Sequence, residues 1–417
     1  MSSPAVLRSA RPPTWTPSDW RHHPAAQQPD WPDPTLLRRI RSRLAGAAAL
    51  VRPHEILDLR RALATAAHGD AFVLQLGDCA ETFDTPTFAG VAARVGLLHG
   101  TARTIGAALG RPVIPVGRLA GQYAKPRSAP TERVGDLVLP SFRGHLVNDP
   151  APDPAARVPD AMRLLAGHAH ARDVLALLRE LAESGMVMPG APAAGAPAVW
   201  TSHEALVLDY EEPQVRRDPV TGSLYLTSTH LPWIGARTCD PGGAHVRFLS
   251  GVGNPVGVKV GPGTERGDLA ALCARLDPDR EPGRLVLISR MGAEHVREVL
   301  PPLVAEVARL GHPAVWLCDP MHGNTYVGAG GYKTRDVATV AAEIRGFFAA
   351  VRSAGGRPGG LHLEATPAEV TECVGSAAGI TEEDLPRRYE TACDPRLNGS
   401  QTAEIAALTA QLCAAGA

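Results

Sequence analysis

From residue 71 to the end of the chain, short apolar runs rich in β-branched residues alternate with longer stretches of helical period. Apolar runs of this length, bounded by polar and Gly/Pro positions, predict strands, and the stretches between them predict helices. Helices are expected over 159–185, 293–310, 334–354 and 399–415, and one or two more over 35–68. The predicted strands are AFVLQLGD (71–78), VIPVGRLA (113–120), AVWTSHEAL (198–206), HLPWIGAR (230–237), VGVKVGP (256–262), LVLISRM (285–291), AVWLCDPMH (314–322) and GLHLEAT (360–366).

Eight strands with helical connections favour an α/β fold, a (β/α)8 TIM barrel with an N-terminal extension. A doubly wound open sheet is the alternative, but no GxGxxG follows any of the predicted strands. We assign residues 69–417 to the catalytic barrel and residues 1–68 to an N-terminal arm and helices. The Pro-rich arm contains Trp15, Trp20 and Trp31, which are expected to pack on the barrel or on a neighbouring subunit.

Composition removes several classes of function. The net charge of -1 over 417 residues argues against nucleic-acid or membrane-surface binding, since no excess of basic residues exists. A run of about 18 apolar residues, which a spanning helix needs, does not occur, and the N-terminus lacks the apolar core of a secretory signal. Seven cysteines without framework spacing indicate a reducing compartment, so the cytoplasm is the expected location.

Candidate chemistry lies at the carboxyl ends of the predicted strands, where (β/α)8 enzymes place their functional side chains. Each strand ends in a charged or metal-binding group. In chain order these are Asp78 and Cys79, Arg118, Glu204, Arg237, Lys259, Arg290, His322 and Glu364. A lone Arg or Cys after a strand is usually a solvated or packing residue, but eight at one end point to a common site.

The candidates divide into two sets. The cations would repel one another unless they bound anions, and guanidinium groups match phosphate and carboxylate oxygens. The second set has thiol, imidazole and carboxylate donors, which suit Mn, Co, Fe or Zn better than Ca or Mg. The cationic set is Arg118, Lys125, Arg127, Arg237, Lys259 and Arg290, and the metal set is Cys79, His322, Glu364 and Asp394.

Long motifs over most of the chain resemble type II (class II) 3-deoxy-D-arabino-heptulosonate 7-phosphate (DAHP) synthase, in a short form. The matching segments are GDCAETF, VGRLAGQYAKPRS, PSFRGHLVN, TSHEALVLDYE, WIGART, GAHVRFLSGVGNPVGVKVGP, SRMGAEHVREVLPPLV, CDPMHGNT and YETACDPRLN. The resemblance implies a transferase of the shikimate pathway. It would condense phosphoenolpyruvate with erythrose 4-phosphate, giving DAHP and phosphate.

The resemblance also implies residue roles. Cys79, His322, Glu364 and Asp394 would bind a divalent metal, Mn²⁺ or Co²⁺ before Zn²⁺ or Fe²⁺. Phosphoenolpyruvate would be held by Arg118, Lys125, Arg237, Lys259 and Arg290, with Ala236 contributing its backbone amide. Arg127 and Ser128 would take the aldose phosphate. Catalytic roles fall to Lys259 and to His322 or Glu204, either of which could handle the protons of the attacking water.

The sequence departs from the usual family pattern in two respects. Ala236 stands where Glu is common, which leaves open a different aldose phosphate as substrate. The stretch between Ser128 and Glu204 is short for the helical insertion that longer members use for inhibition by aromatic amino acids. We therefore expect weak or absent feedback inhibition and a role in secondary metabolism. A non-catalytic paralogue acting as a partner subunit is a further alternative.

The resemblance carries two expectations about association and redox chemistry. A homodimer or higher homo-oligomer is expected, and chorismate mutase is a candidate partner. If Cys79 and Asp394 share a metal, Cys393 must lie near Cys79, and a Cys79–Cys393 disulfide could form in metal-free, oxidised protein.

Overall fold

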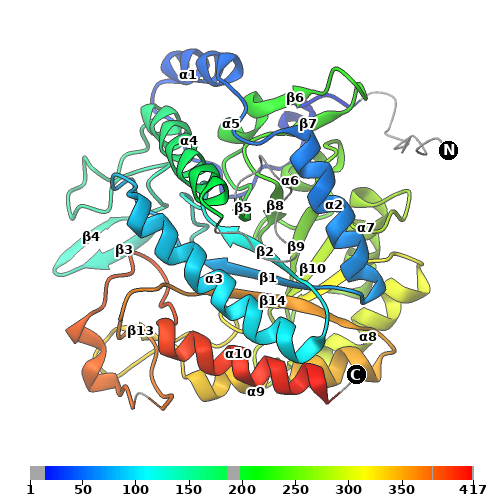
Figure 1. Ribbon diagram of the computed structural model, residues 1–417. Coiled ribbons are helices and arrows are strands. Elements are labelled where there is room, and N and C mark those ends of the chain that lie inside the picture. The colour runs from blue at the N-terminus through cyan, green and yellow to red at the C-terminus, as the bar shows by residue number, and fades with distance from the viewer. Residues whose placement is uncertain (1–14, 186–197, 378, 416–417) are drawn as a thin grey trace.

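Eight parallel strands form a closed barrel at the centre of the computed structural model (Figure 1). The structure describes residues 15–185, 198–377 and 379–415. The strands pair around the barrel in the order β1-β14-β11-β10-β9-β8-β5-β2. They are β1 (Phe72–Gly77), β2 (Val113–Arg118), β5 (Trp200–Glu204), β8 (Leu231–Ile234), β9 (Val256–Val260), β10 (Leu285–Ser289), β11 (Val315–Cys318) and β14 (Pro358–Glu364).

All eight strands predicted from the sequence are confirmed, and so is the (β/α)8 fold. The four predicted barrel helices are present with ends shifted by a few residues, and Figure 1 shows the helices surrounding the strands. Helices of the barrel are α3 (Phe88–Leu109), α4 (Met162–Glu183), α6 (Ala244–Ser250), α7 (Arg266–Leu276), α8 (Val296–Arg309), α9 (Val337–Ser353) and α10 (Gly399–Ala414).

Short excursions interrupt the β/α alternation. Between β5 and β8 the crossover consists of small elements in place of a long helix. These elements are α5 (Leu208–Glu211), η2 (Glu212–Gln214) and the hairpin of β6 (Val215–Arg217) with β7 (Leu224–Leu226). Elsewhere, the hairpin of β3 (Thr131–Val134) with β4 (Leu137–Pro140) follows β2, the hairpin of β12 (Tyr326–Val327) with β13 (Lys333–Thr334) follows β11, and η3 (Glu382–Arg387) follows β14.

The N-terminal segment packs on the barrel. Helix α2 (Pro53–His68) buries Leu59 and Leu63 against residues from the first halves of the strands, among them Val73 and Val286. Val73 and Val286 are the second residues of β1 and β10, so α2 closes the barrel at the amino ends of the strands. Function in (β/α)8 barrels lies at the other end, where the strands have their carboxyl ends. Helix α1 (Pro34–Gly46) and the turn η1 (Asp19–His22) precede it.

The tryptophans of the arm contact the body of the same chain. Trp15 donates its indole N–H to the Arg247 carbonyl at 3.0 Å, and Trp31 donates to Asp209 at 3.1 Å. Trp20 is buried and donates to Glu212 at 2.8 Å. The sequence left open whether these side chains pack on the barrel or on a neighbouring subunit, and in this structure they contact the body of their own chain.

Candidate active site

The candidate residues converge at the carboxyl end of the barrel because β1 and its neighbours run parallel. Arg118, Glu204 and Glu364 are the last residues of β2, β5 and β14. Strand β1 ends at Gly77, and Cys79 is the second residue after it. Only glycine fits at position 77, since a Cβ there would lie 2.6 Å from the Arg118 carbonyl oxygen.

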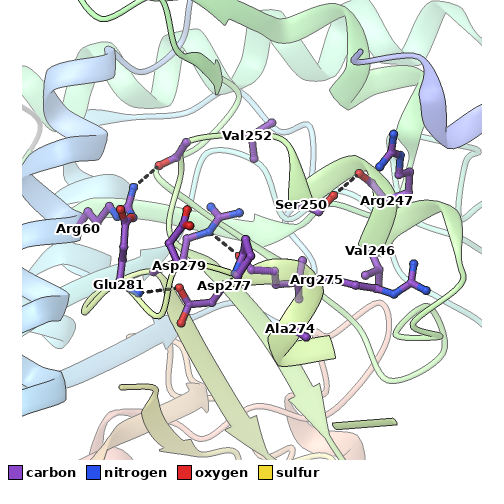
Figure 2. Close-up of a pocket in the computed structure, with 14 residues that line it drawn as sticks. Arg60, Val246, Arg247, Ser250, Val252, Ala274, Arg275, Asp277, Asp279 and Glu281 are labelled. Atoms are coloured by element: carbon purple, nitrogen blue, oxygen red, sulfur yellow. Dashed lines mark hydrogen bonds and ion pairs between the residues drawn. The ribbon is translucent and has the colours of Figure 1, made fainter. Parts of the chain in front are cut away.

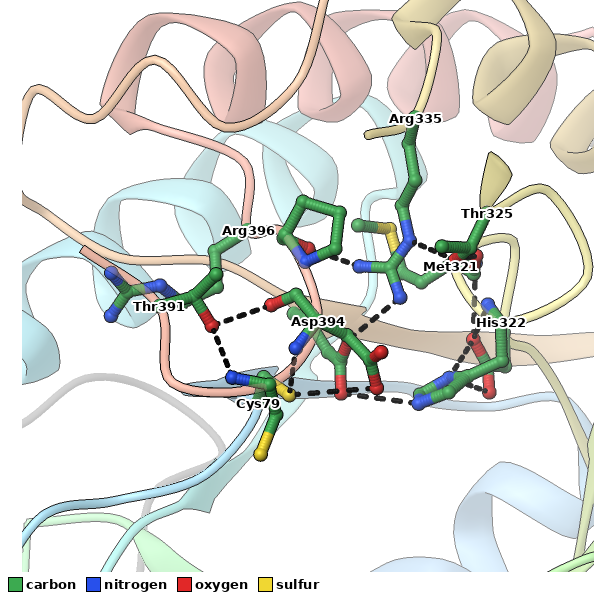
Figure 3. Close-up of polar contacts among 12 residues, drawn as sticks. Cys79, Met321, His322, Thr325, Arg335, Thr391, Asp394 and Arg396 are labelled. Atoms are coloured by element: carbon green, nitrogen blue, oxygen red, sulfur yellow. Dashed lines mark hydrogen bonds and ion pairs between the residues drawn. The ribbon is translucent and has the colours of Figure 1, made fainter. Parts of the chain in front are cut away.

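Three predicted metal ligands gather in one cluster. A donor atom from each of Cys79, Glu364 and Asp394 lies within 4.8 Å of the other two. His322, the fourth predicted ligand, is outside this group of three but lies beside it, with its Nε2 3.2 Å from Glu364 Oε1. Figure 3 shows Cys79, Asp394 and His322 pointing toward a common centre. A thiol, an imidazole and two carboxylates are the donor types that bind divalent transition metals, so these residues fit such an ion.

Cations surround Glu364 and keep it charged. Its Oε1 lies 2.9 Å from Arg118 and 3.4 Å from Lys125, and its Oε2 lies 2.9 Å from Arg335. Burial raises the pKa of this carboxyl, but His322, Lys125, Arg335 and Arg118 outweigh it and hold the pKa well below its ordinary value. The pKa of Asp394 is also lowered, against its burial, chiefly by Lys125.

The thiol of Cys79 behaves in the opposite way. Burial raises its pKa well above the ordinary value, and the thiol contact with Cys393 and the charge of Glu364 raise it further. The charge of Lys125 opposes these effects without outweighing them. A metal ion binds the thiolate form, so an ion bound at this position would favour loss of the proton.

Asp319 orients His322. It is fully buried behind the metal cluster, and its carboxylate accepts from His322 Nδ1 at 2.8 Å and lies 2.5 Å from Lys259 Nζ. Because Nδ1 is occupied, His322 presents Nε2 toward Glu364. A carboxylate behind a ligating histidine fixes the ring in this way in many metal sites.

A polar layer lies directly below the cluster, inside the barrel. Arg118 contacts His362 Nε2 at 2.5 Å, and His362 Nδ1 lies 2.7 Å from the Gln75 side-chain oxygen. Burial, together with Lys259 and Arg118, holds the pKa of His362 well below its ordinary value. A neutral His362 therefore accepts from Arg118 and donates to Gln75.

Glu81, from the GDCAETF motif, shapes the loop that carries Lys125. Its carboxylate accepts from the backbone N–H groups of Ala120, Gly121 and Gln122 at 2.8–3.0 Å. Ala120 has a left-handed backbone with φ 61°, which is uncommon for a residue other than glycine. The carboxylate thus stabilises a turn that directs Lys125 into the site.

A cavity of about 230 Å³ opens beside the metal cluster and is lined with cations. Its size and charge suit small phosphorylated ligands. The charged and hydroxyl side chains that line it include Lys125, Arg127, Ser128, Arg237, Arg290, His322, Lys333 and Asp394.

The other predicted residues do not line this cavity. Arg118 and Lys259 are buried and pair with Glu364 and Asp319, respectively. Glu204 packs against Gly235, and its Oε1 is buried without a hydrogen-bond partner. Burial raises the pKa of Glu204 although Lys125, Lys259 and His322 oppose the shift. The side chain of Ala236 is exposed, and its carbonyl accepts from Cys239.

Three residues of the site were missed from the sequence. Asp319 follows β11 directly, so the strand-end rule could have found it. Lys333, 3.2 Å from Asp394, and Arg335 arrive from the segment around β13, where strand ends give no signal.

A larger cavity of about 370 Å³ lies far from this chemistry, beside the loops that enter β9 and β10 (Figure 2). Several of its charged groups are paired within the chain. Arg60 forms an ion pair with Glu281, and Asp277 with His312. Loops at the amino ends of barrel strands serve stability, and these pairs fit that role.

Fold and site together define a (β/α)8-barrel enzyme with a candidate metal centre beside a pocket for anionic substrates. Among the described residues, no helix is long and apolar enough to cross a membrane. A solved structure titled phospho-2-dehydro-3-deoxyheptonate aldolase from Francisella tularensis shares the fold. It superposes with a TM-score of 0.53 at 15% identity, over 89% of this chain and 95% of that one.

Sequence comparisons give the family. The profile of the class-II DAHP synthetase family matches residues 15–194 and 190–410. A probable phospho-2-dehydro-3-deoxyheptonate aldolase of Pseudomonas fluorescens is 50% identical, over 90% of this chain and 92% of its own length. Enzymes of that name from Streptomyces coelicolor (42%; 94% and 96% covered) and Mycolicibacterium smegmatis (40%; 93% and 92%) are also similar.

The chain therefore belongs to the class-II DAHP synthetase family, which confirms the resemblance in its motifs. Its activity is that of a 3-deoxy-7-phosphoheptulonate synthase, a transferase that joins phosphoenolpyruvate and erythrose 4-phosphate.

Proposed function

We propose that Cys79, His322, Glu364 and Asp394 bind the catalytic metal of this synthase, with Mn²⁺ or Co²⁺ preferred and Zn²⁺ or Fe²⁺ as alternatives. The observation that carries the proposal is the position of this donor cluster beside the cation-lined cavity. A mixed thiolate, imidazole and carboxylate set favours transition metals over Ca²⁺ or Mg²⁺. When bound, such an ion polarises the aldehyde of the sugar phosphate as a Lewis acid.

The cations divide the cavity between two substrates. We assign Arg118, Lys125, Arg237, Lys259 and Arg290 to the phosphate and carboxylate of phosphoenolpyruvate, with the backbone amide of Ala236. Arg127 and Ser128 are assigned to the phosphate of the aldose, and both line the cavity. Holding two mutually repelling anions with their reacting carbons adjacent removes much of the entropic barrier to carbon–carbon bond formation.

Glu204 is our choice for handling the protons of the water that attacks the adduct. His322 has both ring nitrogens committed, one to Asp319 and one toward the metal cluster. Glu204 instead has a free buried oxygen, and its pKa is raised by burial, which brings it nearer to the pKa that proton transfer at neutral pH requires. His322 then acts as a ligand.

The chelation experiment tests the metal assignment. Consumption of phosphoenolpyruvate with erythrose 4-phosphate should stop after chelation and return on addition of Mn²⁺ or Co²⁺. Cys79→Ala should lose both metal binding and activity. Cys273→Ala, which removes another buried thiol on α7, should retain both. Full activity after exhaustive chelation, or in Cys79→Ala, would refute the assignment, and an inactive metal-bound enzyme would favour the non-catalytic paralogue.

Weak feedback inhibition by aromatic amino acids, and service in secondary metabolism, are also proposed. The alignments with the Streptomyces and Mycolicibacterium relatives extend over 432 and 433 positions, more than the 417 residues of this chain, so those relatives contain segments that it lacks. The linker around 186–197 lies outside the described residues. Strong inhibition of the purified enzyme by Trp, Phe or Tyr would contradict the proposal.

The remaining proposals concern association and substrate range. We propose a cytoplasmic homodimer or higher oligomer in which residues 1–68 supply subunit contacts beside the 69–417 barrel, with chorismate mutase as a candidate partner. The exposed position of Ala236 keeps a different aldose phosphate open. Phosphate release across a panel of aldose phosphates measures that preference.

A further inference from the structure

The N-terminal arm contacts the wall of the substrate cavity through the side chain of Gln27, which binds Arg127. Its amide oxygen accepts from the backbone N–H of Arg127 at 2.9 Å, and its amide nitrogen donates to the Arg127 carbonyl at 3.1 Å. A single side chain thus satisfies both backbone groups of a residue that is 100 positions away. No other side chain is recorded on these two groups among the described residues.

Gln27 is itself held firmly in place. Arg143 donates to the carbonyl oxygens of Gln27 and Gln28, the latter at 3.2 Å. The Gln28 side chain accepts from Leu208 N at 2.9 Å and donates to the Leu206 carbonyl at 2.8 Å. Gln27 adopts a left-handed backbone, φ 61°, which a residue other than glycine keeps only when its surroundings require it.

The Arg127 segment depends on this support because it has open space on two sides. Arg127, Ser128 and Ala129 line the 230 Å³ cavity of the active site. The same three residues line a second cavity of about 490 Å³, whose lining also includes Gln27 and Arg143. The segment is therefore a thin wall between two cavities, with little packing to fix its backbone.

The guanidinium of Arg127 is fixed separately from its backbone. It pairs with Glu132, which also accepts from Arg157 at 2.5 Å and from Phe142 N at 3.0 Å. These contacts direct the end of the side chain. Gln27 holds the peptide on both sides of Arg127, and the next fixed point along the segment is the Ala129 carbonyl, which accepts from the Ser141 hydroxyl at 2.8 Å.

We propose that Gln27 is a positioning residue for the aldose phosphate site, which it controls by fixing the backbone of Arg127 and Ser128. This inference rests on the proposed role of those two residues. It makes the N-terminal arm a part of the active site. It also predicts that loss of the Gln27 side chain impairs the use of the aldose phosphate and spares phosphoenolpyruvate. Four of the five cations assigned to phosphoenolpyruvate lie on other segments, and the fifth, Lys125, is held by Glu364 and Asp394.

Steady-state kinetics of Gln27→Ala and Gln27→Glu test the proposal. The loss of two hydrogen bonds to a substrate-binding segment should raise KM for erythrose 4-phosphate about tenfold, while KM for phosphoenolpyruvate stays within about twofold. Gln27→Glu keeps the size and one acceptor but removes the donor to the Arg127 carbonyl, so the same selective change is expected even if Gln27→Ala folds poorly. Trp31→Phe is the control, because it loosens the arm at Asp209 without touching Arg127.

Arg127→Met is measured in parallel to separate this inference from the function on which it rests. If Arg127→Met raises KM for the aldose and both Gln27 variants do not, the role of Gln27 is refuted and the role of Arg127 stands. If Arg127→Met has no effect on that KM, both assignments are refuted. Equal rises of both KM values in the Gln27 variants and in Trp31→Phe would show a general structural role and also overturn the inference.

Discussion

Lys259 is the residue at which the chemistry of the site should depend most visibly on pH. Burial lowers its pKa to about 8, and the charges of Arg118 and Arg290 add to the shift, although Asp319 opposes it. Lysine is cationic below its pKa, so Lys259 loses its positive charge as the pH rises through about 8. An anionic substrate should then bind more weakly.

We therefore expect kcat/KM for phosphoenolpyruvate to fall as the pH rises above about 8. Lys259→Arg keeps a charge that does not titrate in this range, so it should move the alkaline decrease to higher pH. The measurement is the pH profile of kcat/KM for each substrate. The ordinary pKa of lysine is about 10.4. A wild-type profile that stays flat to pH 10 would therefore mean that the pKa of Lys259 is not lowered, which contradicts the prediction.

Single residues also show where prediction from the sequence stopped. Cys79, Glu364 and His322 follow barrel strands, and the parallel arrangement of the strands was enough to bring them together. The position of Asp319 directly after β11 marks it as a candidate, but its role in orienting His322 follows from its contacts with His322 and Lys259. Lys333 and Gln27 come from segments whose path over the barrel no periodicity encodes.

At the scale of elements, the strands could be predicted and the irregular segments could not. Buried parallel strands are continuous apolar runs, which is why all eight were recognisable. The strands of the hairpins β3–β4, β6–β7 and β12–β13 have two to four residues each, too few for a period of two to be recognised. Helix α2 was expected, but its position against the amino ends of the barrel strands depends on the fold as a whole and is not encoded in its own sequence pattern.

Helix α2 should be a structural element with no direct part in catalysis. Leu63 is fully buried at the end of the barrel opposite the active site. Leu63→Ala should lower the free energy of unfolding by about 2–5 kcal/mol, as other buried leucine truncations do, while KM values of the folded enzyme stay unchanged. Chemical denaturation measures the loss.

Leu57→Ala is the matched control on the same helix, because Leu57 is only partly buried. Its cost should be clearly smaller. Equal costs for the two variants would show that the packing of α2 into the barrel has been misassigned.

At the scale of the whole molecule, the segment after the first barrel strand and the segment after the last one are in contact through two thiols. Cys79 and Cys393 are free, and their thiols are in hydrogen-bonding contact. That contact lowers the pKa of Cys393, so Cys393 supplies the more reactive thiol of the pair.

Oxidised, metal-free protein should form a Cys79–Cys393 disulfide, whereas protein loaded with Mn²⁺ should keep both thiols because Cys79 is then a ligand. Thiol counting before and after oxidation, with mass mapping of the linked peptides, checks this. Cys393→Ser should abolish the crosslink and retain metal binding. Equal thiol loss with and without Mn²⁺ would contradict the assignment of Cys79 as a metal ligand.

Cys79 and Asp394 also lie 315 positions apart in the order of synthesis, one at the first strand of the barrel and one after the last. A nascent chain on the ribosome therefore cannot assemble the proposed metal site until Asp394 has emerged. Products that end before Asp394, however well their early strands fold, would lack one of the four proposed ligands, so they should compete poorly for the ion.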